Sequence, residues 1–232
     1  MSLNHSPKIV TDGLVLCLDA ANRKSYPGSG TTWFDRSGRG NHGTLVNGAA
    51  YSSSYTGSIV LDGLNDRVEG NISSSTFLGP HSISCWFYRR SQKQWAGLFS
   101  NNVNTYSSSL LTFIDNTTFI GVNQAGVNGN YIGVDLSSDH FNKWIYCTIV
   151  FSGYTSGSLV KVYAYKGNSL LQTTGNLYWT LTSSSQYYIG DHYTDARLMF
   201  DGFIPQTLVY NKALTAQEVQ QNFNATRGRF GI

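Results

Sequence analysis

Aromatic, carboxylate and guanidinium side chains occur together in one short segment of the chain, residues 191–197. Sugars present apolar faces that stack on aromatic rings, and their hydroxyl groups bond to carboxylates, amides and guanidinium groups. The tryptophan at position 179 lies shortly before this segment and offers a further ring. We therefore predict a carbohydrate site formed by Trp179, Asp191, His192, Tyr193, Asp195 and Arg197.

Other aromatic side chains offer the same stacking surface. They are Tyr26, Trp33, Trp95, Tyr106, Tyr187 and Tyr188. The alternative is that most of the tryptophans fill the core or its rim, because large rings contribute much of the area that a core buries. The sequence leaves this choice open for Trp33, Trp95 and Trp179.

The sequence contains no arrangement of residues typical of a catalytic site. A retaining glycosidase needs two carboxyl groups about 5 to 5.5 Å apart, yet the chain holds only two glutamates, Glu69 and Glu218. Glu218 fits a helix cap, and Glu69 has no acidic residue two positions away. Two aspartate pairs that flank loops, Asp191 with Asp195 and Asp62 with Asp66, stay open as alternatives. The histidines are scattered, and no Gly-x-Ser-x-Gly motif is present. We expect the chain to have no catalytic residues and no enzymatic activity.

Short strands separated by turns account for most of the sequence. Apolar or alternating runs bounded by Gly, Asn, Ser or Asp predict strands at about 14–19, 58–62, 66–69, 82–89, 96–100, 110–114, 119–122, 144–151, 159–165, 187–190 and 199–210. The run 144–151 is apolar almost throughout, which favours a central strand buried on both faces. One helix is predicted at about 215–224, because Thr215 and Glu218 form a capping box before an apolar face. We expect this helix to pack against an end or edge of the strands.

Composition favours one β-rich domain with a weakly charged surface. Charged residues make up 12% of the chain, against about a quarter in an average soluble protein. The net charge is +3 and the basic residues are scattered, so we expect no nucleic-acid partner. Residues 1–8 are polar and no apolar run is long enough to cross a membrane, so we expect neither a signal peptide nor a membrane span. Cys17, Cys85 and Cys147 lie in apolar strand patterns and are predicted to be buried free thiols.

Two segments of the chain resemble the two ends of a known domain. Residues 35–43 (DRSGRGNHG) and 209–219 (VYNKALTAQEV) are similar to those of the laminin-G-like, concanavalin A-like jelly roll, in the form found in bacteriophage virion proteins. Further matches lie between them at 57–63 with Asp66, at 82–87, at 144–148 and at 162–168. The resemblance implies an all-β fold, a two-sheet antiparallel jelly-roll sandwich with one short C-terminal helix.

The resemblance also implies a place for a metal ion. Similar jelly rolls often hold a structural calcium between an early strand and the last strand, which makes Asp19, Asp35 and Asp201 the candidate ligands. The alternative is that Asp35 and Asp201 form local turns with the residues that follow them. An acidic pair common in relatives is replaced here by Pro205 and Gln206. We therefore expect no cofactor, with calcium as the alternative.

The resemblance further predicts a non-enzymatic bacteriophage virion structural protein, which would be a decoration, cement or tail-associated adhesive subunit on the capsid or tail. The alternative is a lectin-like receptor-binding protein that recognises host surface glycans. We divide the chain into an N-terminal arm (1–9), a laminin-G-like β-sandwich (10–226) and a C-terminal tail (227–232), and expect both arms to dock on other virion proteins. The protein would then reside in the virion after assembly in the host cytoplasm.

Apolar residues in the two arms predict association with further copies of the chain. Ile9, Phe230 and Ile232 lie where a monomer would have little core left to bury them. We therefore expect a homo-oligomer, with a trimer preferred because many phage particles offer local threefold positions.

Overall fold

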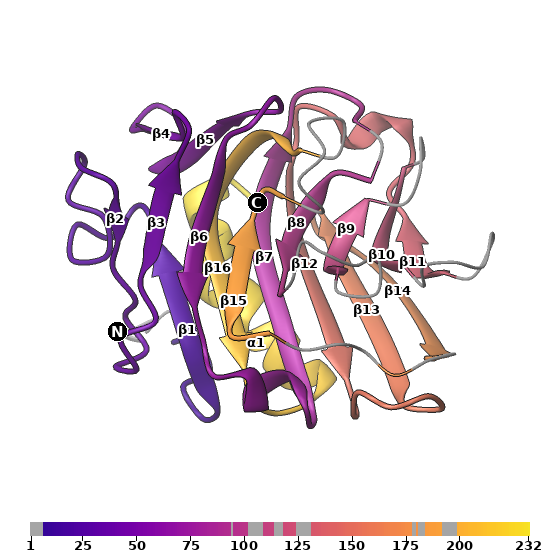
Figure 1. Cartoon of the computed structure of the whole chain (residues 1–232). Helices are drawn as coiled ribbons and strands as arrows, with labels where there is room; N and C mark the ends of the chain where they lie inside the picture. Colours follow the sequence, from indigo (N-terminus) through magenta and orange to yellow (C-terminus); the bar gives the residue numbers. More distant parts are fainter. Residues whose placement is uncertain are drawn as a thin grey trace, which may run out of the picture.

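The computed structural model describes residues 7–93, 95–101, 109–113, 118–123, 131–177, 180, 184–191 and 199–232. Two antiparallel eight-stranded sheets stack as a sandwich, with one helix behind the rear sheet (Figure 1). The predicted two-sheet antiparallel sandwich is therefore confirmed.

The rear sheet, sheet A, contains the longest strands. In order across the sheet, its strands are β14 (Ser169–Asn176), β13 (Leu159–Lys166), β12 (Trp144–Phe151), β7 (His81–Arg89), β16 (Asp201–Tyr210), β5 (Ser58–Asp62) and β4 (Ala50–Ser52). The early strand β1 (Leu14–Asp19) also pairs with β16, along its second half.

The front sheet, sheet B, contains the remaining strands. Their order is β11 (Tyr131–Asp135), β10 (Phe119–Asn123), β9 (Ser109–Phe113), β8 (Gly97–Ser100), β15 (Gln186–Ile189), β6 (Arg67–Asn71), β3 (Gly43–Val46) and β2 (Thr32–Trp33). Among the described residues, short 3-10 helices join strands or follow the helix: η1 (Ser74–Phe77), η3 (Ser138–His140) and η5 (Arg227–Phe230).

The main hydrophobic core lies between the two sheets and includes the inward face of β12. This strand lies between β7 and β13, and its residues from Ile145 to Phe151 are all buried. Ile145 and Ile149 face the main core, whereas Tyr146 and Val150 belong to a second cluster on the opposite face. The predicted central strand is confirmed, since apolar material covers both of its faces. Cys17, Cys85 and Cys147 are buried free thiols, as predicted.

The helix α1 (Ala216–Thr226) begins at the predicted capping box. Glu218 N donates to Thr215 Oγ1 at 3.2 Å, and Thr215 N donates to Glu218 Oε2 at 2.8 Å. The expected position at an end or edge of the sandwich is wrong, because α1 covers the outer face of sheet A. Phe223 packs there against Trp86, so the helix buries apolar surface that a free sheet face would expose. No helix in the described ranges is both long and apolar enough to cross a bilayer.

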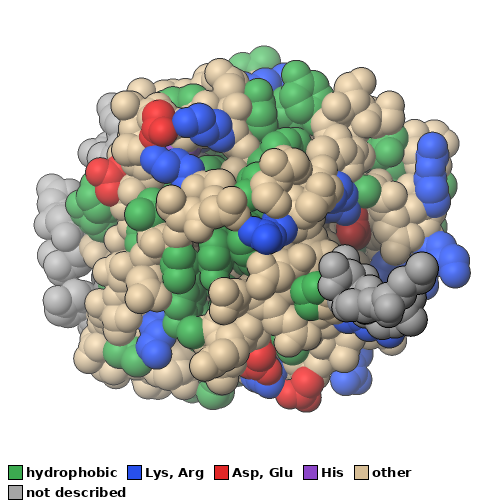
Figure 2. Space-filling view, turned by 180° about the vertical axis from the view of Figure 1, so that it is seen from behind, with side chains coloured by type: hydrophobic (Ala, Val, Ile, Leu, Met, Phe, Trp, Pro, Cys, Tyr) green, Lys and Arg blue, Asp and Glu red, His purple; other side chains and the backbone are tan. Residues whose placement is uncertain are grey.

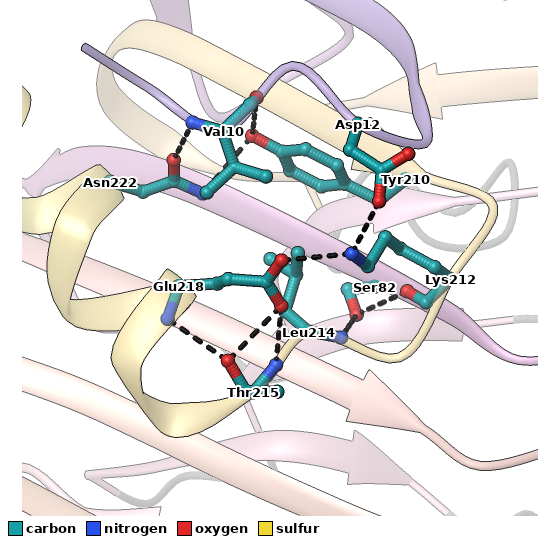
Figure 3. Close-up of polar contacts among 9 residues, drawn as sticks. All are labelled: Val10, Asp12, Ser82, Tyr210, Lys212, Leu214, Thr215, Glu218 and Asn222. Atoms are coloured by element: carbon teal, nitrogen blue, oxygen red, sulfur yellow. Dashed lines mark hydrogen bonds and ion pairs between the residues drawn. The ribbon is translucent and has the colours of Figure 1, made fainter.

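Hydrogen bonds and an ion pair hold residues 10–12, near the N-terminus, against α1 and the segment before it (Figure 3). Val10 N donates to Asn222 Oδ1 at 2.8 Å, and Tyr210 OH donates to Val10 O at 3.0 Å. Lys212 Nζ donates to Asp12 Oδ2 at 2.7 Å and pairs with the carboxylate of the capping box at 2.8 Å. The described part of the predicted N-terminal arm, residues 7–9, therefore leads into a segment that is held against the domain's own helix.

The predicted C-terminal tail is also part of the domain, which corrects the expectation of a free docking arm. Phe230 is buried in the second cluster, with its ring stacked on Trp86 at a centroid distance of 4.0 Å. Ile9 and Ile232 are partly buried against the same cluster. The tail folds back because sheet A offers it an uncovered aromatic surface beyond the end of α1. Burial of these three residues therefore needs no second copy of the chain.

Charges are sparse on the back of the molecule. Figure 2 shows Lys, Arg, Asp and Glu side chains dispersed on this face among apolar and uncharged polar ones.

Candidate functional site

Most of the predicted carbohydrate site lies outside the described residues. The residues outside are Trp179, His192, Tyr193, Asp195 and Arg197, so their part of the hypothesis stays a prediction. Asp191 is described; it follows β15, and its side chain is fully buried. Its Oδ2 lies 3.7 Å from Arg67 Nε. The Asp191 carboxylate therefore acts inside the protein, beside Arg67, rather than on the surface.

A groove on the outer face of sheet B runs alongside β15. Strand pairing places Thr44, Glu69 and Tyr188 in one row across β3, β6 and β15. Asn71 and Gln186, which lie opposite each other, form the next row. Both rows point to the same face because alternate residues of a strand do so. The groove has a volume of about 250 Å³ and is lined by His42, Thr44, Glu69, Gly70, Asn71, Gln186, Tyr187 and Tyr188.

A buried tyrosine ring packs beneath the sheet, on the core side of the groove. Tyr187 is fully buried, and its hydroxyl donates to Asn41 O at 3.0 Å. Gly70 lies directly opposite it on β6, and a Cβ atom at position 70 would come within 2.3 Å of the ring. Glycine is therefore required at this position for the ring to lie against the β6 backbone.

Charged groups are concentrated at one end of the groove. Arg67 Nε donates to Glu69 Oε1 at 2.6 Å, and Nη2 lies 2.5 Å from the same oxygen. Tyr188 OH donates to Gln186 Oε1 at 3.1 Å. Burial raises the pKa of Tyr188, the carboxylates of Glu69 and Asp191 raise it further, and the guanidinium of Arg67 opposes them. Tyr188 therefore remains a protonated phenol, and so a hydrogen-bond donor, at neutral pH.

This set of groups suits a polyhydroxylated ligand. The amide N–H groups of Asn71 and Gln186 donate, and the carboxylate and amide oxygens accept, so both kinds of partner that a sugar hydroxyl needs are present. Asn71 and Gln186 are exposed, whereas Tyr188 is 8% exposed and forms part of a wall. The arrangement can therefore bind a ligand through its exposed amides.

The first predicted calcium ligand, Asp35, is bonded to protein donors. Its Oδ1 accepts from Cys17 N and Ser37 N, each at 2.8 Å. Its Oδ2 accepts from Ser37 Oγ at 2.6 Å and from Asn41 N at 3.0 Å. The local turn that the sequence left open is present, and it holds loop 35–41 against the edge of β1.

The other two predicted ligands lie on different strands, Asp19 at the end of β1 and Asp201 at the start of β16. Asp19 is opposite Gln206, and its carboxylate accepts from Gln206 Nε2 at 3.1 Å and from Arg229 Nη1 at 2.7 Å. Asp201 begins β16, five residues before Gln206, and pairs with Arg90 at 2.6 Å. Within the described ranges no three His, Cys, Asp or Glu side chains form a metal-binding group. The structure therefore does not bring Asp19, Asp35 and Asp201 together as one ligand set.

The predicted aromatic candidates divide between core and groove. Trp33 is fully buried and Tyr26 is 2% exposed, so the core interpretation applies to both. Tyr187 and Tyr188 both line the groove, but Tyr187 belongs to the main core, whereas Tyr188 points to the outer face. Its neighbours Glu69, Asn71 and Gln186 were not predicted as site residues, because they come from strands far apart in the sequence.

A second hollow lies at the end of α1, and it is larger. It has a volume of about 550 Å³ and is lined by Asp19, Asn224, Ala225, Thr226, Arg227, Gly228, Arg229 and Ile232. None of these described lining residues is aromatic, and the Arg229–Asp19 ion pair, 2.7 Å long, borders the hollow. The groove on sheet B therefore remains the better candidate for sugar binding.

Comparison with known proteins identifies the type of domain. A family model described as the concanavalin A-like lectin/glucanases superfamily, of the laminin-G type, matches residues 62–220. No curated protein sequence matches the chain.

Three solved structures illustrate the fold. Domain 4 of AbnA, a GH43 extracellular arabinanase from Geobacillus stearothermophilus solved with arabinotriose, is 16% identical, with a TM-score of 0.56 over 95% of this chain and 100% of that domain. The receptor-binding domain of botulinum neurotoxin C/D mosaic serotype is 18% identical, with a TM-score of 0.62 over 93% of this chain and 51% of that one. Trypanosoma rangeli sialidase in complex with sialic acid is 13% identical, with a TM-score of 0.63 over 93% of this chain and 33% of the sialidase chain.

These similarities differ in extent. The chain spans the whole arabinanase domain, but only about half of the neurotoxin domain and a third of the sialidase. At such low identity the structures show a shared fold, and together with the family match they confirm the predicted concanavalin A-like jelly roll.

Proposed function

Since the chain belongs to the concanavalin A-like lectin/glucanase superfamily, we propose that it is a non-catalytic carbohydrate-binding protein that serves as an adhesive structural subunit of a bacteriophage particle. The groove on the outer face of sheet B carries this proposal. It combines the exposed amides Asn71 and Gln186 with the phenol of Tyr188 and the carboxylate of Glu69. An arabinanase domain with the same fold was solved with arabinotriose, which supports carbohydrate as the ligand class.

The charges beside the groove favour a neutral glycan. Two carboxylates, Glu69 and Asp191, face the single guanidinium of Arg67 at this end. An anionic sugar would meet like charge there, which costs free energy where solvent is partly excluded. We therefore propose that the ligand is a neutral polysaccharide of the host surface.

The same residues argue against glycoside hydrolysis. A glycosidase holds its two carboxyl groups on either side of the scissile bond. Here both carboxylates lie within 4 Å of the same guanidinium, Glu69 at 2.5 Å and Asp191 at 3.7 Å, so both are engaged with Arg67. Asp191 is also fully buried and presents no oxygen to a ligand in the groove. We propose that the protein binds without cleaving.

The virion part of the proposal depends on sequence resemblance and surface composition. Segments 35–43 and 209–219 are similar to the phage form of the family. A surface with few charges suits lasting protein contacts, since charged residues are depleted at the centre of interfaces. Location of the chain by electron microscopy of purified particles, with an antibody against it, tests this part. A particle that carries no copies would contradict the virion role and leave the groove proposal intact.

Two exposed amides provide the test of the groove. In the double variant Asn71→Ala with Gln186→Ala, a bound glycan loses about two hydrogen bonds worth about 1 kcal/mol each. We expect the dissociation constant for host surface polysaccharide to rise about thirtyfold. Gln220→Ala is the matched control, because Gln220 is exposed on α1, behind the other sheet.

Isothermal titration of the purified chain with the polysaccharide measures this effect. Equal affinities for the wild type and the double variant would remove the groove as the site. The same mixtures, assayed for newly formed reducing ends, test the absence of hydrolysis. Reproducible reducing-end release that Glu69→Gln abolishes would show that the protein is an enzyme.

A further inference from the structure

The outermost strands of the two sheets differ in how their free edges are protected. An unprotected edge strand offers backbone N–H and C=O groups to any extended segment, so proteins usually shorten, cover or charge it. In sheet B, β2 has two residues; in sheet A, β4 has three. At the other end of sheet B, β11 has five residues and ends in the charged Asp135. These three edges are short.

The free edge of β1 is covered by the loop 35–41. Asp35 Oδ1 accepts from Cys17 N at 2.8 Å, and Arg36 N donates to Cys17 O at 2.8 Å. Asn41 Nδ2 donates to Val15 O at 2.7 Å. The backbone of β1 is therefore bonded on both sides.

The remaining edge is β14, and the described part of the chain gives it none of these protections. It has eight residues, reads SLLQTTGN, and pairs only with β13 among the described strands. It contains no charged residue and no proline, and its pairing with β13 continues without a register shift from Ser169 to Asn176. A long, regular and uncharged edge of this kind is a template for strand addition.

The hairpin turn determines which backbone groups of β14 point outward. Lys166 and Ser169 flank the two-residue turn and form a hydrogen-bonded pair. Hydrogen-bonded and non-bonded pairs alternate along an antiparallel ladder. The odd-numbered residues of β14 therefore bond to β13, and Leu170, Gln172 and Thr174 direct their N–H and C=O groups to the free edge. All three are exposed, and no described group bonds to their backbone.

The turn end of this edge is fixed in place. Lys166 Nζ donates to Leu136 O at 3.0 Å and to Asp139 Oδ1 at 2.6 Å. These bonds tie the end of β13 to the connection between β11 and β12. A strand end that is held in this way loses less entropy when it pairs with a partner.

We propose that β14 pairs antiparallel with β14 of a second copy of this chain, which joins the two A sheets into one continuous sheet. A twofold axis at Thr173 places Gln172 opposite the partner's Thr174, and Thr174 opposite the partner's Gln172. The outward backbone groups of these two residues then find partners. The edge suits a copy of itself because it has no charge that would oppose an identical charge. A twofold dimer is also the commonest closed assembly, and it differs from the trimer that the sequence suggested.

The dimer has a consequence for the groove on sheet B. An antiparallel pair within one sheet is related by an axis perpendicular to that sheet, so both molecules keep the same face forward. Both grooves would then face the same direction. Two sites on one side bind a surface polysaccharide more tightly than either does alone. This consequence depends on the proposed function, whereas the interface itself does not.

Two substitutions at Gln172 test the interface by sedimentation of the full chain. Gln172→Pro removes an outward N–H that β13 does not use, and proline is tolerated on such an edge. Gln172→Lys brings two like charges to within about 8 Å across the axis. We expect the wild type to have twice the chain mass of 25.6 kDa and both variants to be monomers. Gln220→Lys adds the same charge on α1 and should remain a dimer.

Amide hydrogen exchange provides a second readout that does not depend on the variants. The N–H groups of Gln172 and Thr174 should exchange slowly in the dimer, and quickly on dilution or in Gln172→Lys. A wild type that is a monomer or a trimer would overturn the proposal. A dimer that survives both substitutions, or one in which these two amides exchange quickly, would overturn it equally. Glycan binding by a monomer, in contrast, would leave the proposed function standing.

Discussion

The C-terminal segment 227–232 should contribute directly to the stability of the fold, and Phe230→Ala measures that contribution. The Phe230 ring is 8% exposed, stacks on Trp86 at 4.0 Å and contacts Trp144 at 4.9 Å. Truncation of a buried phenylalanine costs about 3 to 5 kcal/mol. We take the lower figure, about 3 kcal/mol, because a segment near the chain end can relax into part of the space. For a chain of this size, that corresponds to a fall in Tm of about 6 to 12 °C.

Thermal and urea unfolding, followed by circular dichroism, test this value. Leu78→Ala is the control, because Leu78 is 46% exposed and its truncation should change stability by less than about 0.5 kcal/mol. If Phe230→Ala unfolded at the wild-type temperature, the segment would be an arm rather than part of the core. Deletion of 227–232 should likewise destabilise the protein rather than only weaken its assembly.

Two further predictions concern protons and calcium. Burial lowers the pKa of His81 from 6.5 to about 4. Between these two values the unfolded chain binds a proton at His81 that the folded chain does not bind. The free energy of unfolding should therefore fall by about 2 kcal/mol between pH 7 and pH 5. Urea unfolding at both pH values should show this loss and show it reduced in His81→Phe; an equal loss in the variant would refute the assignment. Because protein donors bond the Asp19, Asp35 and Asp201 carboxylates, a chelator should leave the Tm unchanged, whereas a calcium site would add several kcal/mol. A fall in Tm that calcium reverses and Asp201→Ala abolishes would contradict this expectation.

The sequence predicted the central strands and the helix well, because local patterns determine them. The apolar run of β12 and the Thr215–Glu218 capping box both lie within a few residues. Among the described strands, β2, β3, β4, β11 and β14 were missed. The first four have only two to five residues each, and β11 (YIGVD) alternates over just five. The sequence of β14, SLLQTTGN, lacks the apolar run or strict alternation of a half-buried strand, so only its pairing with β13 reveals it.

The groove could be predicted only in part. The aromatic Tyr188 was recognisable by residue type, but its neighbour Glu69 comes from β6, more than a hundred residues earlier. The register between distant strands decides which side chains share a row, and a sequence read alone does not specify it. The position of Phe230 was missed for a similar reason, because its partner Trp86 lies on β7, far away in the sequence.

An NMR titration of the purified chain with neutral host polysaccharide tests the central claim most directly. The account predicts saturable shifts of the backbone amides of Asn71, Gln186 and Tyr188, with no cleavage of the polysaccharide during the titration. Absence of any saturable shift, or shifts confined to the α1 side of sheet A, would contradict a carbohydrate site in the groove of sheet B.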